Sequence, residues 1–213
     1  MVTLKLFVEG GGDATLLRNE CRQGFSKFLS RAGLAGRMPR IVSSGSRMSA
    51  YKDFCTAIAN GERALLLVDS EGPVEKQHAS GDDRSNWRPW LHLAQRVGDG
   101  WAQPQTADDP LCHLMVQCME TWFLADPETL KSFYSQGFKS NALPPNGNPI
   151  EGVAKSEVFK ALEKATKDCN TKGPYGKAAH SFKLLGLIDP AKVVAASPWA
   201  KRFVDEIKRQ MAC

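Results

Sequence analysis

The sequence has no run of apolar residues long enough to cross a membrane, no CxxC pair and no Walker-type glycine loop. A membrane-spanning helix needs about 20 consecutive apolar residues, so we expect none here. The missing glycine loop argues against the chain being its own ATPase. Six cysteines are scattered along the chain, and the first apolar run is too short for a secretory segment. Reduced thiols in the cytoplasm are therefore expected rather than a disulfide framework.

Cys112, His113 and Cys118 lie close together in the sequence, which raises the question of a zinc site. Their spacing matches no structural zinc motif. Buried cysteine is common in protein cores. We therefore interpret these three residues as part of the core.

The composition is that of an ordinary globular protein. The 213 residues fit one large domain, or one domain with an appendage. Hydrophobic residues make up 42% of the chain, which is enough for a sizeable core. The net charge of +5 is compatible with a nucleic-acid partner, and so small an excess is equally typical of a mildly basic enzyme. Composition alone thus leaves the function open.

Two apolar runs near the start of the chain each end at a carboxylate. Residues 4–8 precede Glu9, and residues 64–68 precede Asp69, which lies two positions before Glu71. Each run predicts a buried strand with a turn after it. Ligands of open α/β sheets bind just beyond the carboxyl ends of the strands. Carboxylates placed there suit a divalent metal such as Mg²⁺, which favours phosphoryl-transfer or nuclease chemistry.

The predicted elements alternate between strands and helices. Strands are expected at 4–9, 40–44, 64–69 and 111–119, with helices at about 14–32 and 49–60. This order predicts right-handed crossovers and an α/β fold with a mostly parallel sheet flanked by helices. We predict a core at 1–136, a connection at 137–152 and a helical C-terminal appendage at 153–213 packed on the core. The helices of the appendage are expected at 153–168, 177–186, 190–196 and 198–211.

Three acidic residues are the candidates for metal binding besides Glu9. Asp69 and Glu71 are two apart, and such residues point to the same side of an extended chain, so they could face one ion or two close ions. The alternative is a solvated acidic turn. Glu120 ends the predicted strand at 111–119. The alternative for Glu120 is a first-turn glutamate that the helix dipole favours.

Other polar residues near predicted helix starts are also candidates. Asp13 and Asp126 are expected to be helix N-caps, and Asp13 could also support a ligand. Lys177 and His180 lie one helical turn apart and could contact a phosphate or a leaving group together. The alternative is an exposed lysine and a partly buried histidine. Basic residues predicted near the carboxyl edge, which could contact a phosphate backbone, are Arg40, Arg47, Lys52, Arg84 and Arg88.

The strand-end carboxylates and their order resemble the Toprim fold. Topoisomerases, bacterial primases and nucleases of the overcoming-lysogenization-defect family share this fold. The resemblance rests on Val8-Glu9-Gly10 and on Leu67-Val68-Asp69-Ser70-Glu71 in a later predicted parallel strand. In the Toprim fold, a glutamate on the first strand and an Asp-x-Asp pair on a later strand hold Mg²⁺. Here the pair is Asp-x-Glu, which changes the reach of the second carboxylate by one methylene.

A more specific resemblance is to a Toprim-like family whose members are often encoded beside ABC-type ATPases in phage-defence loci. The MVQ-x-MEAWFLAD segment of that family is similar to residues 115–126 here, which read MVQCMETWFLAD. Other similar segments are Asp99-Gly100-Trp101, Tyr175-x-Lys177-x-x-His180, Leu184-Leu185 and Ile188-Asp189-Pro190. The resemblance spans most of the chain.

By this resemblance, Glu9, Asp69 and Glu71 would bind Mg²⁺ or Mn²⁺. Glu120 would be a fourth acid of the catalytic site and a metal ligand, and Lys177 would contact a phosphate. The implied function is a metal-dependent nuclease in the cytoplasm that cleaves DNA or RNA, tRNA included, in defence against phage. An ABC-type ATPase is the implied partner protein.

Two other functions are compatible with the sequence. One is a non-catalytic or conditionally active subunit that binds an ATPase partner through an apolar face of the C-terminal helices. That face would contain Phe182, Leu184, Leu185, Leu187 and Ile188. Exposure of these side chains would favour an interface, and burial would make them core. The other function is a phosphatase or nucleotide hydrolase that uses the same acids.

Overall fold

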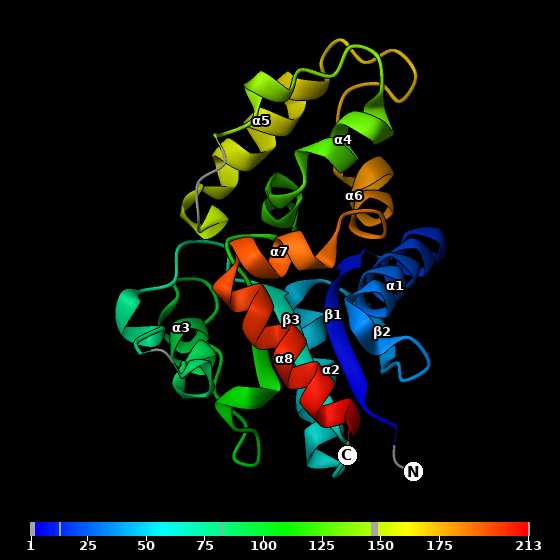
Figure 1. Cartoon of the computed structure of the whole chain (residues 1–213). Coiled ribbons are helices and arrows are strands. Elements are labelled where there is room, and N and C mark those ends of the chain that lie inside the picture. The colour runs from blue at the N-terminus through cyan, green and yellow to red at the C-terminus, as the bar shows by residue number, and fades with distance from the viewer. Residues whose placement is uncertain (1–2, 13, 82, 146–148, 213) are drawn as a thin grey trace.

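Four parallel strands form the sheet of the computed structural model, which describes residues 3–12, 14–81, 83–145 and 149–212 (Figure 1). The strands are β1 (Lys5–Gly11), β2 (Arg40–Gly45), β3 (Ala64–Asp69) and β4 (Cys112–Met115), in the spatial order β2-β1-β3-β4. β1 pairs in parallel with β2 and β3, and β3 pairs in parallel with β4. The predicted α/β class, with a parallel sheet flanked by helices, is confirmed.

The order of the strands creates a topological switch point between β1 and β3. The chain passes from β1 outwards to β2, returns across β1 to β3, and continues outwards to β4. At such a point the connections leave in opposite directions, which opens a crevice at the carboxyl ends of the two strands. Glu9 belongs to β1 and Asp69 ends β3, so both lie at this crevice.

Alternating side chains give the sheet two buried faces. Leu6 and Val8 of β1 join the larger hydrophobic cluster, whereas Phe7 between them joins a second cluster on the opposite face. Every residue of β3 is buried. Burial on both faces explains why the β3 sequence is a continuous apolar run rather than an alternating one.

Helices cover both faces of the sheet. α1 (Thr15–Leu29) and α8 (Pro198–Ala212) pack on one face, and α2 (Arg47–Ala59) and α3 (Pro89–Gln95) pack on the other. Large side chains that these helices bury against the sheet include Phe25, Phe28, Phe203, Phe54 and Trp90. Both faces of a parallel sheet are covered in this way because its strands are apolar on both sides.

The remaining helices lie on the side of the carboxyl ends of the strands, in the upper half of the molecule in Figure 1. They are α4 (Pro127–Tyr134), α5 (Lys155–Thr166), α6 (Lys177–Leu185) and α7 (Pro190–Ala196). Their buried hydrophobic side chains belong to the same cluster as the β1 side chains Leu6 and Val8. Among the described residues, no helix combines the length and the apolar character that crossing a membrane requires.

The bounds of the C-terminal helices agree with their predictions within two residues. Two strands differ. β1 continues past Glu9, because Gly10 and Gly11 both pair with Gly45 of β2 around a bulge. β4 ends at Met115 rather than at residue 119, and Glu120 lies in the 3-10 helix that follows. Asp13, the predicted N-cap, lies outside the described residues.

α1 and α6 pack in close contact at Gly24, in the middle of α1. A methyl group added at Gly24 would lie 2.5 Å from the carbonyl oxygen of Phe182 in α6. We therefore expect Gly24→Ala to destabilise the protein by about 1–3 kcal/mol, because the backbones must separate. In an open helix the same change would stabilise by about 1 kcal/mol.

Urea unfolding of the Gly24→Ala variant measures this effect. Gln23→Ala is the matched control, because Gln23 is the exposed neighbour on α1. The control should stay within about 0.5 kcal/mol of the wild type. A stabilised Gly24→Ala variant would contradict the close packing of α1 on α6.

Candidate metal centre

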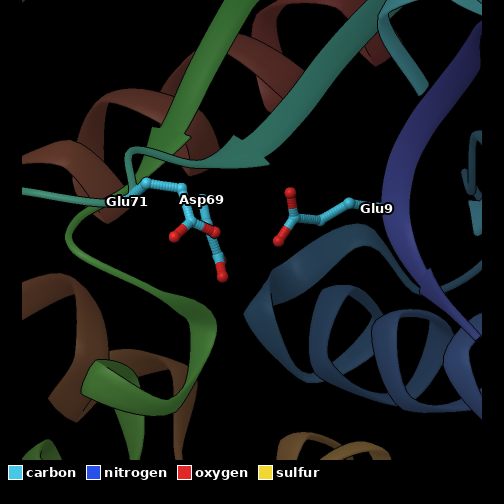
Figure 2. Close-up of side chains that lie close together, drawn as sticks. All are labelled: Glu9, Asp69 and Glu71. Atoms are coloured by element: carbon cyan, nitrogen blue, oxygen red, sulfur yellow. The ribbon is translucent and has the colours of Figure 1, made fainter. Parts of the chain in front are cut away.

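Three carboxylates meet at the switch point between β1 and β3. Glu9, Asp69 and Glu71 each offer one oxygen, and these oxygens lie within 4.8 Å of one another. Figure 2 shows the Glu9 side chain extending from β1 toward Asp69 and Glu71 at the end of β3. The structure thus brings together the three residues that the sequence singled out.

Glu71 reaches the cluster from a turn, not from an extended chain. Its φ angle is 63°, in a region that few non-glycine residues adopt. Two hydrogen bonds fix this turn: the Ser70 amide donates to the Met115 carbonyl at 3.0 Å, and the Glu71 amide to the Gln117 carbonyl at 2.9 Å. The carboxylates of Asp69 and Glu71 do meet, but the predicted reason, an extended backbone, is wrong. Uncommon backbone conformations of this kind concentrate at functional sites.

Burial perturbs two of the three carboxylates. Asp69 is 1% exposed, and its Oδ1 accepts a hydrogen bond from the Met119 amide at 2.8 Å. Burial, and then the charges of Glu9 and Glu120, hold the pKa of Asp69 well above its ordinary value. Burial also raises the pKa of Glu9, although Asp69 and Arg47 act against it. Mutually repelling carboxylates in a buried site favour the binding of a cation.

Lys155, the first residue of α5, places an ammonium beside the cluster. Its Nζ lies 2.7 Å from Glu71 Oε1 and 3.7 Å from Asp69 Oδ2, and its amide donates to Gln117 Oε1 at 3.0 Å. Burial alone would lower the pKa of Lys155, but Glu71 and Asp69 raise it. Lys155 was not among the predicted site residues, because no spacing in the sequence links position 155 to the strand end at 69–71.

Arg47, the first residue of α2, holds the backbone and one acid of the cluster in place. Its Nε donates to the Asp69 carbonyl at 3.0 Å and lies 3.3 Å from Glu9 Oε2. Its two terminal nitrogens bind the Asp99 carboxylate at 2.6 and 2.9 Å, and its guanidinium lies over the Trp101 ring. Arg47 was predicted as a contact for the phosphate backbone. Its main contacts are instead within the protein.

Glu120 lies next to the cluster in a separate hydrogen-bonded group. It is fully buried, and its Oε1 accepts hydrogen bonds from the Ser181 hydroxyl at 2.9 Å and the Tyr175 hydroxyl at 3.2 Å. Lys177 Nζ lies 3.9 Å from the same oxygen. Burial alone would lower the pKa of Lys177, but the charges of Glu120, Asp69 and Glu9 raise it. The metal-binding role of Glu120 remains a prediction.

Two other candidates have structural partners. His180 Nδ1 accepts a hydrogen bond from the Gly176 amide, at the start of α6. Asp126 occupies the N-cap position of α4 but makes no capping hydrogen bond there. Its carboxylate instead binds the Asp189 amide and the Lys192 ammonium, which ties α4 to α7. The predicted N-cap position of Asp126 is therefore confirmed, although its carboxylate connects α4 to α7 instead of capping the helix.

His113 is part of the core rather than of a zinc site. It is fully buried, and its Nδ1 accepts a hydrogen bond from Arg202 at 3.0 Å. Burial, followed by the Arg202 charge, holds the pKa of His113 well below its ordinary value. Cys112 and Cys118 are buried free thiols. This agrees with the prediction from their spacing.

The other predicted basic contacts are spread over the molecule. Arg40 begins β2 and pairs in register with Lys5, so it lies at the amino edge of the sheet, opposite the cluster. The prediction that Arg40 lies near the carboxyl edge is wrong, because the strand begins there rather than ends. Lys52 and Arg88 are exposed, and Arg84 packs over the Trp87 ring.

The apolar face proposed for a partner is mostly core. Leu184, Leu185 and Ile188 are fully buried, and Phe182 is partly buried against the main cluster. Leu187 is 45% exposed. A single half-exposed leucine does not make an apolar patch of the size that marks an interface.

The carboxylate cluster suits a hard divalent cation. Mg²⁺ and Mn²⁺ prefer carboxylate oxygens and keep several water ligands, so three acids are sufficient. Glu9 Oε2 is buried without a hydrogen bond among the described residues. The Lys155 ammonium already lies beside two of the three carboxylates, which shows that the cluster accommodates positive charge.

Comparison with known proteins places the chain in one family. No curated protein and no solved structure matches the chain. One family, described as "Domain of unknown function (DUF4276)", matches residues 8–208, a range that includes all the residues of the carboxylate cluster and both nearby lysines. The chain is therefore a member of the DUF4276 family.

Proposed function

We propose that this protein is a Mg²⁺- or Mn²⁺-dependent nuclease that cleaves phosphodiester bonds of DNA or RNA. The observation that supports it is the group of three carboxylate oxygens within 4.8 Å at the switch point of a parallel sheet. Positively charged side chains lie beside these acids, at Lys155 and Lys177. Acids for a metal and cations for a phosphate are the two components that phosphodiester hydrolysis needs.

Each residue of the centre has a distinct role in this proposal. Glu9, Asp69 and Glu71 would hold the metal, and Glu120 is the predicted fourth ligand. When bound, the metal supplies an activated water and neutralises charge on the leaving oxygen. Lys177 would contact the phosphate. Arg47 orients the carbonyl of Asp69 and approaches Glu9, and so keeps the metal-binding side chains in position.

The distribution of charge supports a polymeric substrate. Residues 155–177, which include α5 and the start of α6, carry six lysines and three carboxylates, a net charge of +3 out of the +5 of the chain. This segment begins and ends at the centre, because Lys155 contacts Glu71 and Lys177 approaches Glu120. Lysines beyond the centre would contact phosphates on either side of the cleaved bond.

The cellular setting is proposed from the sequence resemblance. A cytoplasmic location, a role in defence against phage and an ABC-type ATPase partner all follow from that resemblance. The burial of Leu184, Leu185 and Ile188 removes the apolar face that favoured a purely non-catalytic subunit. A nuclease that an ATPase controls remains part of the proposal.

The test combines metal binding with cleavage. Calorimetric titration with Mg²⁺ and with Mn²⁺ measures binding, and the same samples are incubated with supercoiled plasmid DNA and with total tRNA. Glu9→Gln should weaken metal binding at least about 100-fold and abolish cleavage. Glu128→Gln, which removes an exposed carboxylate on α4, is the control and should behave like the wild type.

Three outcomes are decisive. Metal binding and cleavage that both disappear in Glu9→Gln support the nuclease and identify its polymer. Metal binding without cleavage of either polymer contradicts an autonomous nuclease and directs attention to the partner. A folded wild-type protein that binds neither metal refutes the proposed centre.

A further inference from the structure

A cavity opens beside the carboxylate cluster, on the side of β1 that faces β2. Its volume is about 420 Å³, within the range of roughly 300–1,000 Å³ that is typical of small-ligand sites. Three segments distant in sequence line it: the glycine-rich end of β1, the start of α2 and the start of α6. The lining residues that matter here are Glu9, Gly12, Ser46, Arg47, Lys177 and Ala178.

The charges at the cavity favour an anion. Arg47 and Lys177 are the cations among its described lining residues, and Glu9 is the carboxylate. Lys177 is 57% exposed, so its ammonium is accessible to a ligand. The carbonyl oxygens of the glycine-rich segment are already engaged: the Ser43 hydroxyl donates to Gly10 at 2.8 Å, and the Arg18 guanidinium to Gly12 at 2.8 Å.

The first turn of α6 lines this cavity with residues whose amides precede the intrahelical hydrogen bonds. The amides of Ala179 and His180 both donate to the Gly176 carbonyl, at 3.1 and 3.0 Å. The amides of Lys177 and Ala178 precede these bonds, and both residues line the cavity. Amides that precede the first intrahelical hydrogen bond, together with the helix dipole, attract anions.

The first turn of α2 reaches the same cavity. The amides of Ser49 and Ala50 bind the side chain and the carbonyl of Ser46, both at 3.0 Å. The amides of Arg47 and Met48 therefore precede the hydrogen bonds of this helix. Two helix N-termini and the exposed Lys177 ammonium thus converge on one cavity, beside the Arg47 guanidinium that Asp99 already binds.

Glycine backbone forms the wall between the two helices. A Cβ atom at Gly45 would lie 2.9 Å from the Gly12 carbonyl oxygen. At Gly12 itself, such an atom would meet no atom of the described residues within 4 Å, its chain neighbours aside. The wall at Gly45 is therefore closely packed, and the space at Gly12 is open. A ligand can approach the main chain there.

We propose that this cavity binds a phosphate group of a nucleic-acid strand, adjacent to the phosphodiester that lies at the carboxylate cluster. Glu9 lines the cavity and belongs to the cluster, so the two sites adjoin. The inference rests on the proposed function in taking the ligand to be a nucleic acid. A terminal phosphate and a backbone phosphate offer the same chemistry, and the experiment distinguishes them.

The test places a negative charge at the mouth of the cavity by Ala178→Glu. Ala178 is exposed, and an acidic residue in the first turn of a helix is favourable, so the variant should fold. Ala179→Glu is the matched control: it adds the same charge one position further along α6, at an exposed residue that does not line the cavity. The probes are fluorescently labelled dT8 with and without a 5′-phosphate, measured by anisotropy in EDTA at low salt.

If the cavity takes a terminal phosphate, the phosphorylated probe binds more tightly to the wild type, and Ala178→Glu abolishes that preference. If it takes a backbone phosphate, Ala178→Glu weakens both probes by about tenfold or more. In both cases Ala179→Glu has a much smaller effect. Equal effects of the two variants, or none, would overturn the inference.

The use of EDTA separates this inference from the proposed function. Metal binding is measured on the same proteins in a parallel titration without EDTA. If the wild type binds no metal but Ala178→Glu selectively weakens dT8, the phosphate site stands and the nuclease centre fails. If metal binds and Ala178→Glu leaves dT8 binding unchanged, the metal centre stands and the phosphate site fails.

Discussion

Asp69→Asn is expected to abolish metal binding and cleavage while stabilising the metal-free protein. Asparagine keeps the oxygen that accepts the hydrogen bond from the Met119 amide, so the local structure is retained. The change removes the charge that a divalent cation requires. Loss of a direct ligand should weaken Mg²⁺ binding by at least about 100-fold, since changes to outer contacts already cost 10–100-fold.

The metal-free variant is expected to be more stable than the metal-free wild type, because the ionised form of Asp69 is unfavourable in a buried site without a cation. Burial and the neighbouring acids hold the pKa of Asp69 well above its ordinary value. An unfolded aspartate loses its proton near pH 3.9, whereas the folded one retains it to higher pH. Asp69 therefore costs the wild type stability as the pH rises above about 3.9, and the asparagine variant lacks this contribution, although Glu9 still contributes a smaller loss in both proteins. At neutral pH the variant should be more stable by about 1 kcal/mol.

Thermal unfolding in EDTA, at pH values from 3 to 8, measures this difference. The two proteins should coincide at the acid end of the range and diverge as the pH rises. Addition of Mg²⁺ should then raise the unfolding temperature of the wild type and leave that of Asp69→Asn unchanged. If the metal-free variant were less stable than the wild type at pH 7, ionised Asp69 would not be unfavourable in the folded protein, and the prediction would fail.

Arg202→Ala is expected to cause the largest loss of stability among the substitutions considered. The Arg202 guanidinium is 4% exposed, and it donates to the carbonyls of Arg84, Asp109 and Cys112 at 2.7–2.9 Å and to His113 Nδ1 at 3.0 Å. Removal of the guanidinium leaves these three buried carbonyls and His113 Nδ1 without their hydrogen-bond donor. The expected cost is about 3–5 kcal/mol.

Urea unfolding measures the loss, with two comparisons. Lys201→Ala removes the neighbouring exposed lysine of α8, which pairs with Asp205, and should cost no more than about 0.5 kcal/mol. Arg202→Lys keeps the charge but cannot reach four acceptors at once, so it should recover only part of the loss. A lysine variant as stable as the wild type would show that the guanidinium geometry is unimportant.

The architecture was predictable because its signals are local. Apolar runs at 4–8 and 64–68, separated by helical patterns, predicted a parallel sheet, and the structure confirms it. The predicted strand at 111–119 was too long. After Met115 the chain bends, and at Met119 it enters a 3-10 helix with mostly buried side chains. Such a segment has the same composition as a buried strand.

The carboxylates of the centre were foreseeable for the same reason, since the ends of parallel strands meet at one edge. Their partners were not. Lys155 reaches the centre from α5, and Asp99, in the loop after α3, binds Arg47 beside it; both contacts depend on tertiary packing. Tyr175 and Ser181 hold Glu120 across 55 and 61 positions of sequence. No local pattern carries such information.

The position of Lys155 has a consequence for how the centre responds to metal. Its ammonium serves as an internal counterion for Glu71 and Asp69. A divalent ion that binds here would compete with this counterion, so its apparent affinity would reflect the difference between two cations rather than the attraction of bare acids. The start of α5 does not depend on the ammonium alone, because the Lys155 amide is also held by Gln117 Oε1. The Lys155 side chain can therefore exchange partners while the helix that carries the basic segment stays in place.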